Sequence, residues 1–226
     1  GIANGFNGNA NSGFQNADVN IGSLYEFGGA SYSAARGTTT ITAEDNSSGF
    51  AYYNYNSTFT HNNGTMTFND NATHIRGNHF GNLIIDTNNA AGYIQLRWTS
   101  STSTITVDND LTITKGRFNF DSGGVTFIVT GNTTIGANGV YNYGSGGSSQ
   151  PGRATGPHSH NSLTINSGGV YKATSGTTTI TCTTCATYLW WKDLGAGEFY
   201  HNYGTVEIDV TQGAKWIHNS DPDYPF

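Results

Sequence analysis

Charged residues are scarce in this chain: they occupy 11% of its 226 positions, and the net charge is only −6. The nine Lys and Arg are dispersed, whereas a protein that binds nucleic acid gathers them on one face. A disordered chain would combine high net charge with few aromatic residues, but Phe, Tyr and Trp make up 13% here. We therefore expect an ordered protein that does not bind nucleic acid.

Long apolar runs and helical patterns are also missing. No stretch approaches the ~20 apolar residues of a membrane-spanning helix, so we predict no membrane span. No segment of useful length repeats apolar residues at the i, i+3, i+4, i+7 spacing of an amphipathic helix. The 31 Gly, with abundant Thr, Asn and Ser, favour strands and turns instead. The sequence thus predicts an all-β protein.

Cysteine occurs only twice, at Cys182 and Cys185, which is too few for the four ligands of a structural zinc site. An extended strand would point residues i and i+3 to opposite faces, so a disulfide requires the segment to bend. Without a bend the two would be free thiols, and the sequence leaves both alternatives open.

Repetition is what the chain has in abundance. Residues 162–181 (SLTINSGGVYKATSGTTTIT) match residues 23–42 (SLYEFGGASYSAARGTTTIT) without a gap, and FYHNYGT at 199–205 matches FTHNNGT at 59–65. A β-sandwich gives each strand its own environment, whereas each coil of a solenoid stacks on a near copy of itself. We therefore predict a parallel β-helix (β-solenoid) with loop insertions and about eight or nine coils, with a β-sandwich as the runner-up.

The repeat also suggests how the chain is divided. We expect an irregular lead-in or cap at 1–22, and a single solenoid at 23–219 with two related halves, 23–88 and 162–219. A long loop insertion at 142–161 and a tail at 220–226 complete it. Residues 1–10 lack the positively charged start of a signal peptide, so we expect an N-terminus that is mature, processed or excised from a longer protein.

Residues 59–88 follow the pattern F-x-x-N-x-G-T-v-x-F, a turn, and F-x-N-L-x-I. The matching residues are Phe59, Asn62, Gly64, Thr65, Phe68, Phe80, Asn82, Leu83 and Ile85, and in the second copy Phe199, Asn202, Gly204, Thr205 and Ile208. This pattern resembles repeats of bacterial β-solenoid surface (adhesin-like) proteins and of marine bacteriophage fibre or decoration proteins. The resemblance covers about half of the chain. It implies a structural or adhesive role outside the cytoplasm and names no active site.

Two aromatic-rich insertions each lie between a GTTTIT strand and the next F-x-H-N-x-G-T strand. One contains Tyr52 and Tyr53, and the other contains Tyr188, Trp190 and Trp191. Exposed rings form flat platforms for sugars or for a partner protein; alternatively, the rings pack over the side of the solenoid, which we favour because both copies keep them. Adjacent strand residues face opposite sides, so one of Trp190 and Trp191 should face outward and is our first choice for a contact residue.

The loop expected at 142–161 is much longer than an ordinary turn. We predict that it contacts a neighbouring subunit, with Arg153, His158 and His160 as candidate contact residues. His158-x-His160 could place two imidazoles on one side of an extended segment and bind a metal. Because no carboxylate is close in sequence, we predict no metal site there.

We interpret the two Asp-x-Asp pairs and the repeated histidines as residues of turns. The two Asp-x-Asp pairs are Asp108 with Asp110 and Asp221 with Asp223. Such a pair can contribute to a calcium site, but Ca²⁺ takes six to eight oxygen ligands, and turns favour Asp on their own. We predict no catalytic residue and no cofactor, with calcium as the alternative. His61 and His201, at equivalent places of the repeat, are interpreted as turn or stacking residues.

Five Asn-x-Ser/Thr sequons would be N-glycosylation acceptors on surface turns if the host glycosylates secreted proteins. Several arise by chance in a chain so rich in Asn and Thr. They are Asn46, Asn56, Asn63, Asn71 and Asn132.

Three functions of different classes follow from these observations. We favour a non-enzymatic extracellular structural module, either a surface adhesin, a filament subunit or a virion fibre or decoration protein, that self-associates or contacts other structural subunits. The alternatives are a carbohydrate-binding module that recognises surface glycans and a β-helix polysaccharide-degrading enzyme, which would need clustered carboxylates. We expect a location outside the cell, at the cell surface or on a virion.

Overall fold

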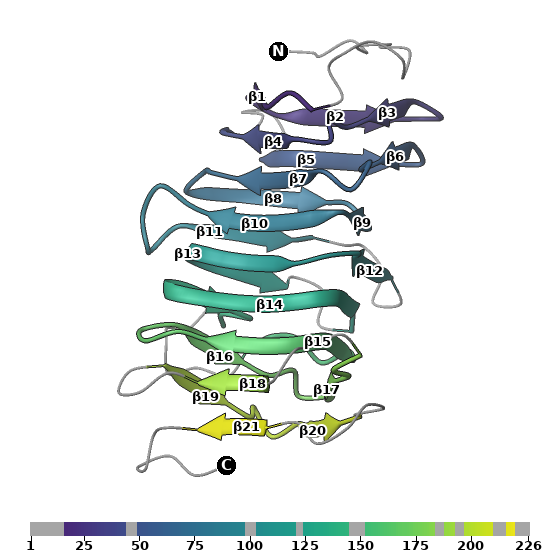
Figure 1. Ribbon diagram of the computed structural model, residues 1–226. Helices are drawn as coiled ribbons and strands as arrows, with labels where there is room; N and C mark the ends of the chain where they lie inside the picture. Colours follow the sequence, from purple (N-terminus) through teal and green to yellow (C-terminus); the bar gives the residue numbers. More distant parts are fainter. Residues whose placement is uncertain are drawn as a thin grey trace.

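The computed structural model describes residues 16–43, 49–97, 103–120, 124–144, 152–183, 188–192, 197–209 and 216–219, with Ala72, residues 188–192 and residues 216–219 described by backbone alone. Every regular element in this part of the chain is a β-strand. The strands stack in parallel, coil upon coil, into an elongated body with β1 near one end and β21 at the other (Figure 1). The predicted parallel β-helix is thus confirmed, and the β-sandwich alternative is not.

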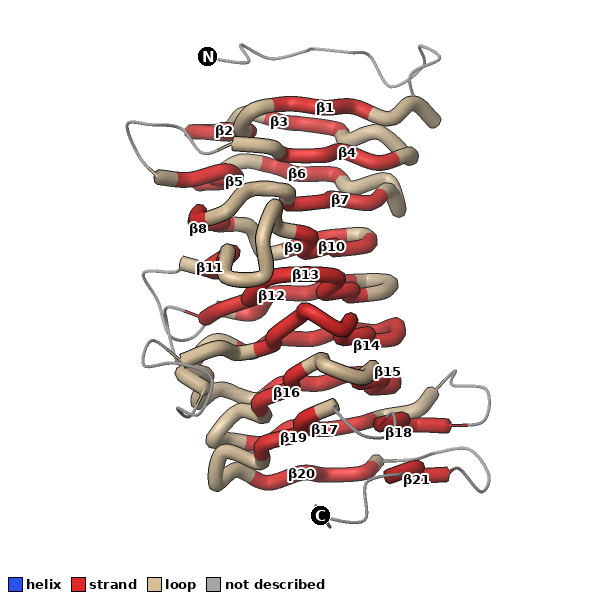
Figure 2. The backbone as a smooth tube through the Cα atoms, turned by 90° about the vertical axis from the view of Figure 1, so that its left-hand side faces the viewer, coloured by secondary structure: helices blue, strands red, loops and turns tan. Residues whose placement is uncertain are grey.

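Each coil runs through three faces in a fixed order, and Figure 2 shows the coils stacked one above another. The first face consists of β1 (Val19–Ile21), β4 (Thr38–Ile41), β7 (Thr65–Phe68), β10 (Asn82–Asp86), the first part of β13 (Leu111–Phe120), the middle of β14 (Thr126–Tyr141), the last part of β15 (His158–Ile165), β18 (Tyr188–Lys192) and β21 (Trp216–Asn219).

The second face continues each coil, and the third closes it. The second face consists of β2 (Leu24–Phe27), β5 (Phe50–Tyr55), β8 (Ala72–Arg76), β11 (Tyr93–Leu96), the last parts of β13 and β14, β16 (Val170–Lys172) and β19 (Glu198–Tyr200). The third face consists of β9 (His79–Phe80), β12 (Thr104–Val107), the first parts of β14 and β15, β17 (Thr177–Ile180) and β20 (Thr205–Ile208). In the first two coils a separate pair, β3 (Ser31–Ser33) and β6 (Thr58–Thr60), takes the place of the third face.

Inward-facing side chains form continuous columns along the axis because successive strands pair in register. On the first face one column is almost entirely isoleucine: Ile21, Ile41, Phe68, Ile85, Ile113, Ile135 and Ile165. From Ile41 onward every member of this column is 0% exposed. Each buried side chain of this size contributes roughly 1.5–3 kcal/mol relative to an exposed one, so the column is a major source of stability.

The sequence repeat encodes contacts between one coil and the next. In the first copy Tyr32 stacks on Phe59 with ring centroids 6.0 Å apart and planes 6° apart. In the second copy Tyr171 stacks on Phe199 at 5.7 Å and 5°. The repeated Tyr and Phe, 27 or 28 positions apart in the sequence, are therefore partners that pack directly on each other.

The Asn-x-Gly-Thr part of the repeat forms a tight corner. Asn62 and Asn202 both have φ of 51°, and the residues after them, Asn63 and Tyr203, have φ of 60° and 58°. Left-handed backbone of this kind is best tolerated by Gly and Asn, which explains the Asn. The same corner therefore occurs in both copies, as the turn interpretation expects.

The glycine of the same corner is required by close approach. A Cβ on Gly64 would lie 2.1 Å from the carbonyl oxygen of Ala35 on the preceding coil. A Cβ on Gly204 would lie 2.1 Å from the carbonyl oxygen of Thr174. The main chains of adjacent coils thus meet at this corner with no room for a side chain.

The two copies of the repeat do not lie on the same faces. β2 is on the second face and its counterpart in β15 on the first, while β4 is on the first face and its counterpart β17 on the third. Likewise β5 is on the second face and β18 on the first. The second copy is therefore turned about the axis by one face relative to the first, so the repeated unit is a set of corners and coil contacts, not a face.

Two expected boundaries differ from the structure. The first rung, β1, lies within the expected lead-in 1–22, because Val19 and Ile21 already pair with Thr39 and Ile41. The expected loop 142–161 ends earlier, since β15 begins at His158. The chain before β15 is tied to the solenoid: Ala154 is 0% exposed and its N–H donates to the side-chain oxygen of buried Asn142 at 3.0 Å. The tail 220–226 lies outside the described residues.

Candidate functional site

One candidate site is a group of aromatic rings on the outer side of the second face, the aromatic patch, formed by Tyr25, Phe27, Phe50, Tyr53 and Tyr55 of β2 and β5. Because alternate strand residues face outward and β2 pairs with β5 in register, the rings meet in pairs. Tyr25 and Tyr53 stack at 5.7 Å, and Phe27 lies 5.1 Å from Tyr53. Phe27 is 56% exposed and Tyr55 44%, so the patch presents apolar surface to solvent.

Arginine from the next coils borders the aromatic patch. The Arg76 guanidinium of β8 lies 4.7 Å from the ring centroid of Tyr55 and 5.2 Å from that of Tyr53. One of its nitrogens also donates to the Tyr53 hydroxyl at 3.1 Å. Arg97, just after β11, lies 6.0 Å from the ring of Phe50. Such cation–π contacts hold the rings in place and put positive charge beside an apolar surface.

The structure divides the predicted contact aromatics. Tyr52 is 1% exposed and packs inside, 5.5 Å from Phe59, so its prediction as a contact residue is wrong. Tyr53, its neighbour in the strand, faces outward and belongs to the aromatic patch. Tyr188, Trp190 and Trp191 lie in β18, where Trp190 pairs with Leu163 and Trp191 with Thr164; their side chains are outside the described part of the chain.

The predicted loop histidines lie in the core. His158 is 1% exposed and His160 is 0% exposed, in the same inward columns as Phe127 and Val129 of the coil before. They are therefore not available for subunit contacts, and that prediction is wrong for both. Arg153, the third predicted contact residue, is exposed.

Hydroxyl groups pair with both nitrogens of His160 and with one nitrogen of His158, whose Nε2 is buried without a hydrogen-bond partner among the described residues. The nitrogens of His160 pair with the Thr133 hydroxyl at 2.7 Å and the Tyr171 hydroxyl at 2.8 Å, and Nδ1 of His158 pairs with the Tyr141 hydroxyl at 2.6 Å. Burial lowers the pKa of His160 to about 3. Burial, and then the nearby His160, hold the pKa of His158 well below its usual value. Both side chains are thus neutral and serve the core.

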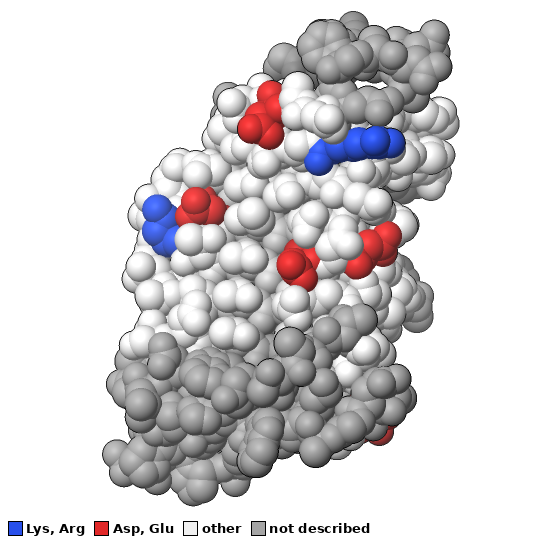
Figure 3. Space-filling model, in the orientation of Figure 1, with Lys and Arg blue, Asp and Glu red and all other residues white. Residues whose placement is uncertain are grey.

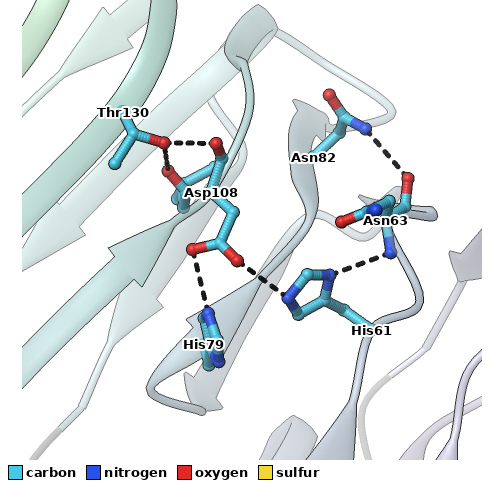
Figure 4. Close-up of polar contacts among 7 residues, drawn as sticks. His61, Asn63, His79, Asn82, Asp108 and Thr130 are labelled. Atoms are coloured by element: carbon cyan, nitrogen blue, oxygen red, sulfur yellow. Dashed lines mark hydrogen bonds and ion pairs between the residues drawn. The ribbon is translucent and has the colours of Figure 1, made fainter.

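A second candidate site is a cluster of His61, His79 and Asp108 (Figure 4). His61 lies in the turn after β6, His79 begins β9, and Asp108 follows β12, so three successive coils each supply one residue. The Nε2 atom of His61 lies 3.1 Å from one oxygen of Asp108, and Nε2 of His79 lies 2.9 Å from the other. This cluster was missed from the sequence, where only its turn residues were recognised.

The prediction that His61 and His201 are turn residues is nevertheless correct. Nδ1 of His61 accepts a hydrogen bond from the Asn63 N–H at 3.1 Å, and Nδ1 of His201 accepts one from the Tyr203 N–H at 2.9 Å. Both histidines thus close the same corner. What distinguishes His61 is that the next two coils place His79 and Asp108 beside its other nitrogen.

The acids at 108–110 act between coils. The Asp110 carboxylate accepts the Asn132 N–H at 2.7 Å, which is a turn contact as predicted, and Asp108 faces the two histidines.

A cavity of about 10 Å³ lies beside His61, which is room for one water and not for a sugar ring. On the face shown in Figure 3 the charged groups are few and scattered among uncharged residues, apart from one basic and one acidic group side by side at the left edge. Asp221 and Asp223 lie outside the described residues.

The remaining predicted sites have mixed outcomes. Cys182 is disulfide-bonded, and its φ of 45° provides the bend that the sequence argument required. Cys185, the only other cysteine of the chain, lies outside the described residues. Four sequon asparagines are exposed: Asn56, Asn63, Asn71 and Asn132. Asn46 is in an undescribed segment.

Comparison of the chain with protein-family models, curated proteins and solved structures found no match. Across the described residues, no helix is long and apolar enough to span a membrane.

Proposed function

We propose that this chain is a non-enzymatic extracellular structural module, a rigid solenoid that meets other subunits through its aromatic patch. The observation that carries the proposal is the unbroken Ile21–Ile165 column, which fills the interior from coil to coil. A packed interior resists bending and compression, so the body suits the transmission of length and force more than the enclosure of a substrate. Surface adhesins, filaments and virion fibres or decoration proteins are uses of this kind.

The neighbouring carboxylates of Asp108 and Asp110 favour this function over a polysaccharide-degrading enzyme. Such enzymes need two carboxyl groups facing one sugar bond, roughly 5–10 Å apart. Asp108 is engaged by two histidines and Asp110 by a main-chain N–H of the next coil. Both carboxylates thus join coils.

The aromatic patch provides the contact surface of the proposed module. Phe27 and Tyr55 are large side chains that solvent touches over about half of their surface, and exposed apolar patches mark interaction sites. We expect the full chain to self-associate with rising concentration in analytical ultracentrifugation and to show rods or filaments by electron microscopy. A Phe27→Ser/Tyr55→Ser double variant should remain monomeric, because it loses the exposed apolar surface of the patch. It should still fold, because both side chains are exposed and contribute little to the core.

Tyr203→Ser is the matched control, since Tyr203 is 89% exposed but lies in a corner outside the patch. It should associate like the unmodified chain. A chain that is monomeric at every concentration, or one that degrades a panel of bacterial and algal polysaccharides, would contradict the proposal.

Carbohydrate binding is the second candidate because the patch also has the chemistry of a sugar platform. The exposed Phe27 and Tyr55 rings offer aromatic surface, and Arg76 beside Tyr55 is a hydrogen-bond donor. A glycan array with the unmodified chain and the Phe27→Ala/Tyr55→Ala variant tests it. Binding that the double variant loses and Tyr203→Ala keeps would support a glycan-binding module. Trp191→Ala tests the counterpart strand β18, and an array with no bound glycan would exclude the idea.

A further inference from the structure

Three metal-ligating side chains from three successive coils converge at the corner between the third and first faces. Nε2 of His61, Nε2 of His79 and the Asp108 carboxylate all lie within 4.8 Å of one another. Figure 4 shows the two imidazoles pointing at the same carboxylate from different strands. The His61 and His79 rings meet edge-on, with centroids 4.7 Å apart and planes at 73°.

The spacing of these atoms suits a shared ion. In a tetrahedral zinc site with bonds of about 2.0–2.1 Å, neighbouring ligand atoms are about 3.3 Å apart. The nitrogens of His61 and His79 lie 3.1 and 2.9 Å from the two different oxygens of Asp108, and the three ligand atoms all lie within 4.8 Å of one another, so rotation of the side chains toward a common centre would reach this spacing. The ion would replace the protons that now lie between the imidazoles and the carboxylate.

We propose that His61, His79 and Asp108 bind one divalent transition-metal ion, which fastens three adjacent coils together. Two imidazoles and one carboxylate suit Zn²⁺, Co²⁺, Ni²⁺ and Cu²⁺, whereas Ca²⁺ and Mg²⁺ prefer sets made of oxygen alone. The two imidazoles and one carboxylate therefore favour a transition-metal ion over the Ca²⁺ that the Asp-x-Asp pair suggested.

Exposure and backbone support both favour the site. The side chains of His61, His79 and Asp108 are 13%, 47% and 37% exposed, so an ion can enter and water can fill a fourth position. Asp108 is held by its own N–H, which donates to the Phe80 carbonyl at 2.9 Å, and by the Thr130 hydroxyl, which donates to its carbonyl. The carboxylate is thus presented by a fixed corner.

Metal binding has one local cost at His61. With Nε2 on the ion, the imidazole proton moves to Nδ1, which then can no longer accept the Asn63 N–H. Asn63 is exposed, so its N–H can turn to water instead. We therefore expect a dissociation constant on the order of 1 μM and not the far tighter binding of a closed four-ligand zinc site.

The test uses the full chain, freed of metal with a chelator, and zinc chloride as the probe at pH 7.5. Calorimetric titration should give one ion per chain, and zinc at a hundred times the dissociation constant should raise the melting temperature by about 5 °C. Cobalt(II) in place of zinc should give the visible absorption bands of a low-symmetry, four-coordinate site. His79→Gln and Asp108→Asn should each weaken binding at least ten-fold and abolish the melting shift.

His201→Gln is the matched control because His201 closes the same kind of corner through Nδ1. It should bind zinc like the unmodified chain. The circular dichroism and melting temperature of the metal-free variants show whether they fold, and His79, almost half exposed, is the substitution least able to disturb folding. The absence of saturable binding, or binding that both site variants retain, would overturn the proposal and leave a hydrogen-bonded corner.

Discussion

At the scale of single residues, the buried histidines show how a polar side chain can be accommodated in the core. A neutral imidazole offers one donor and one acceptor, and a hydroxyl can take either role. His160 has a hydroxyl on each ring nitrogen, from Thr133 and Tyr171, so it is satisfied without charge. The pairing depends on register: Val129 of β14, His160 of β15 and Ile180 of β17 share one column.

These histidines predict acid sensitivity with a definite sign. Their pKa is lowered by folding, so the unfolded chain binds protons that the folded chain does not, and stability is lost as pH falls below about 6.5. Between pH 7.5 and pH 5, each of the two histidines should lower the free energy of unfolding by about 2 kcal/mol, measured by urea denaturation. Replacing His158 and its partner together, His158→Phe with Tyr141→Phe, should remove about half of that loss.

Glu26 works in the opposite direction and must be separated from this effect. Burial raises its pKa from 4.5 to about 7, against a smaller lowering by the hydrogen bond to Tyr52. The stability it contributes is fully present below pH 4.5 and lost as pH rises through 7. Comparing the double variant with the parent at each pH cancels the Glu26 contribution. An unchanged pH dependence in the variant would show that His158 is not among the groups that titrate.

At the scale of strands and corners, the glycines of the repeat set how closely coils approach. Gly64→Ala and Gly204→Ala each place a methyl group about 2 Å from a main-chain oxygen, which forces adjacent coils apart. We expect each substitution to reduce the unfolding free energy by about 3 kcal/mol or more, measured by urea denaturation.

Gly22→Ala is the control for this loss, because no described atom lies within 4 Å of the place that its methyl group would take. It should change stability by no more than about 0.5 kcal/mol. Equal losses at all three glycines would contradict close packing as the cause, because the lower backbone entropy of the unfolded alanine variants favours folding.

The elements were predictable to different degrees. The GTTTIT strands and the Asn-x-Gly-Thr corners could be predicted because strand propensity and left-handed backbone act locally. His158-Ser-His160 alternates like a strand, but a polar segment after Gly, Ser and Pro resembles a loop unless its hydroxyl partners are known. Those partners come from another face of the solenoid, at Tyr141 and Tyr171, 17 and 11 positions away from His158 and His160 in the sequence, and no local rule supplies them.

At the scale of the whole molecule, repetition predicted the solenoid but not which residues meet across it. Parallel coils bring together residues about one coil length apart, and that length varies. His61 and His79 are 18 positions apart (79 − 61), whereas His79 and Asp108 are 29 apart (108 − 79). An insertion in one coil shifts all later partners, so only the folded structure reveals the His61–His79–Asp108 cluster. The aromatic patch was partly predictable, since it lies in one of the aromatic insertions.

The rotation of the two copies has a consequence for any assembly that uses them. Features that are equivalent in sequence, such as the aromatic strands β5 and β18, look out in different directions from the axis. A partner that recognised both would have to follow a helical path around the solenoid axis. In a longer array with the same offset, equivalent features would face the same direction only after every third unit, so attachments would be spread evenly around the rod.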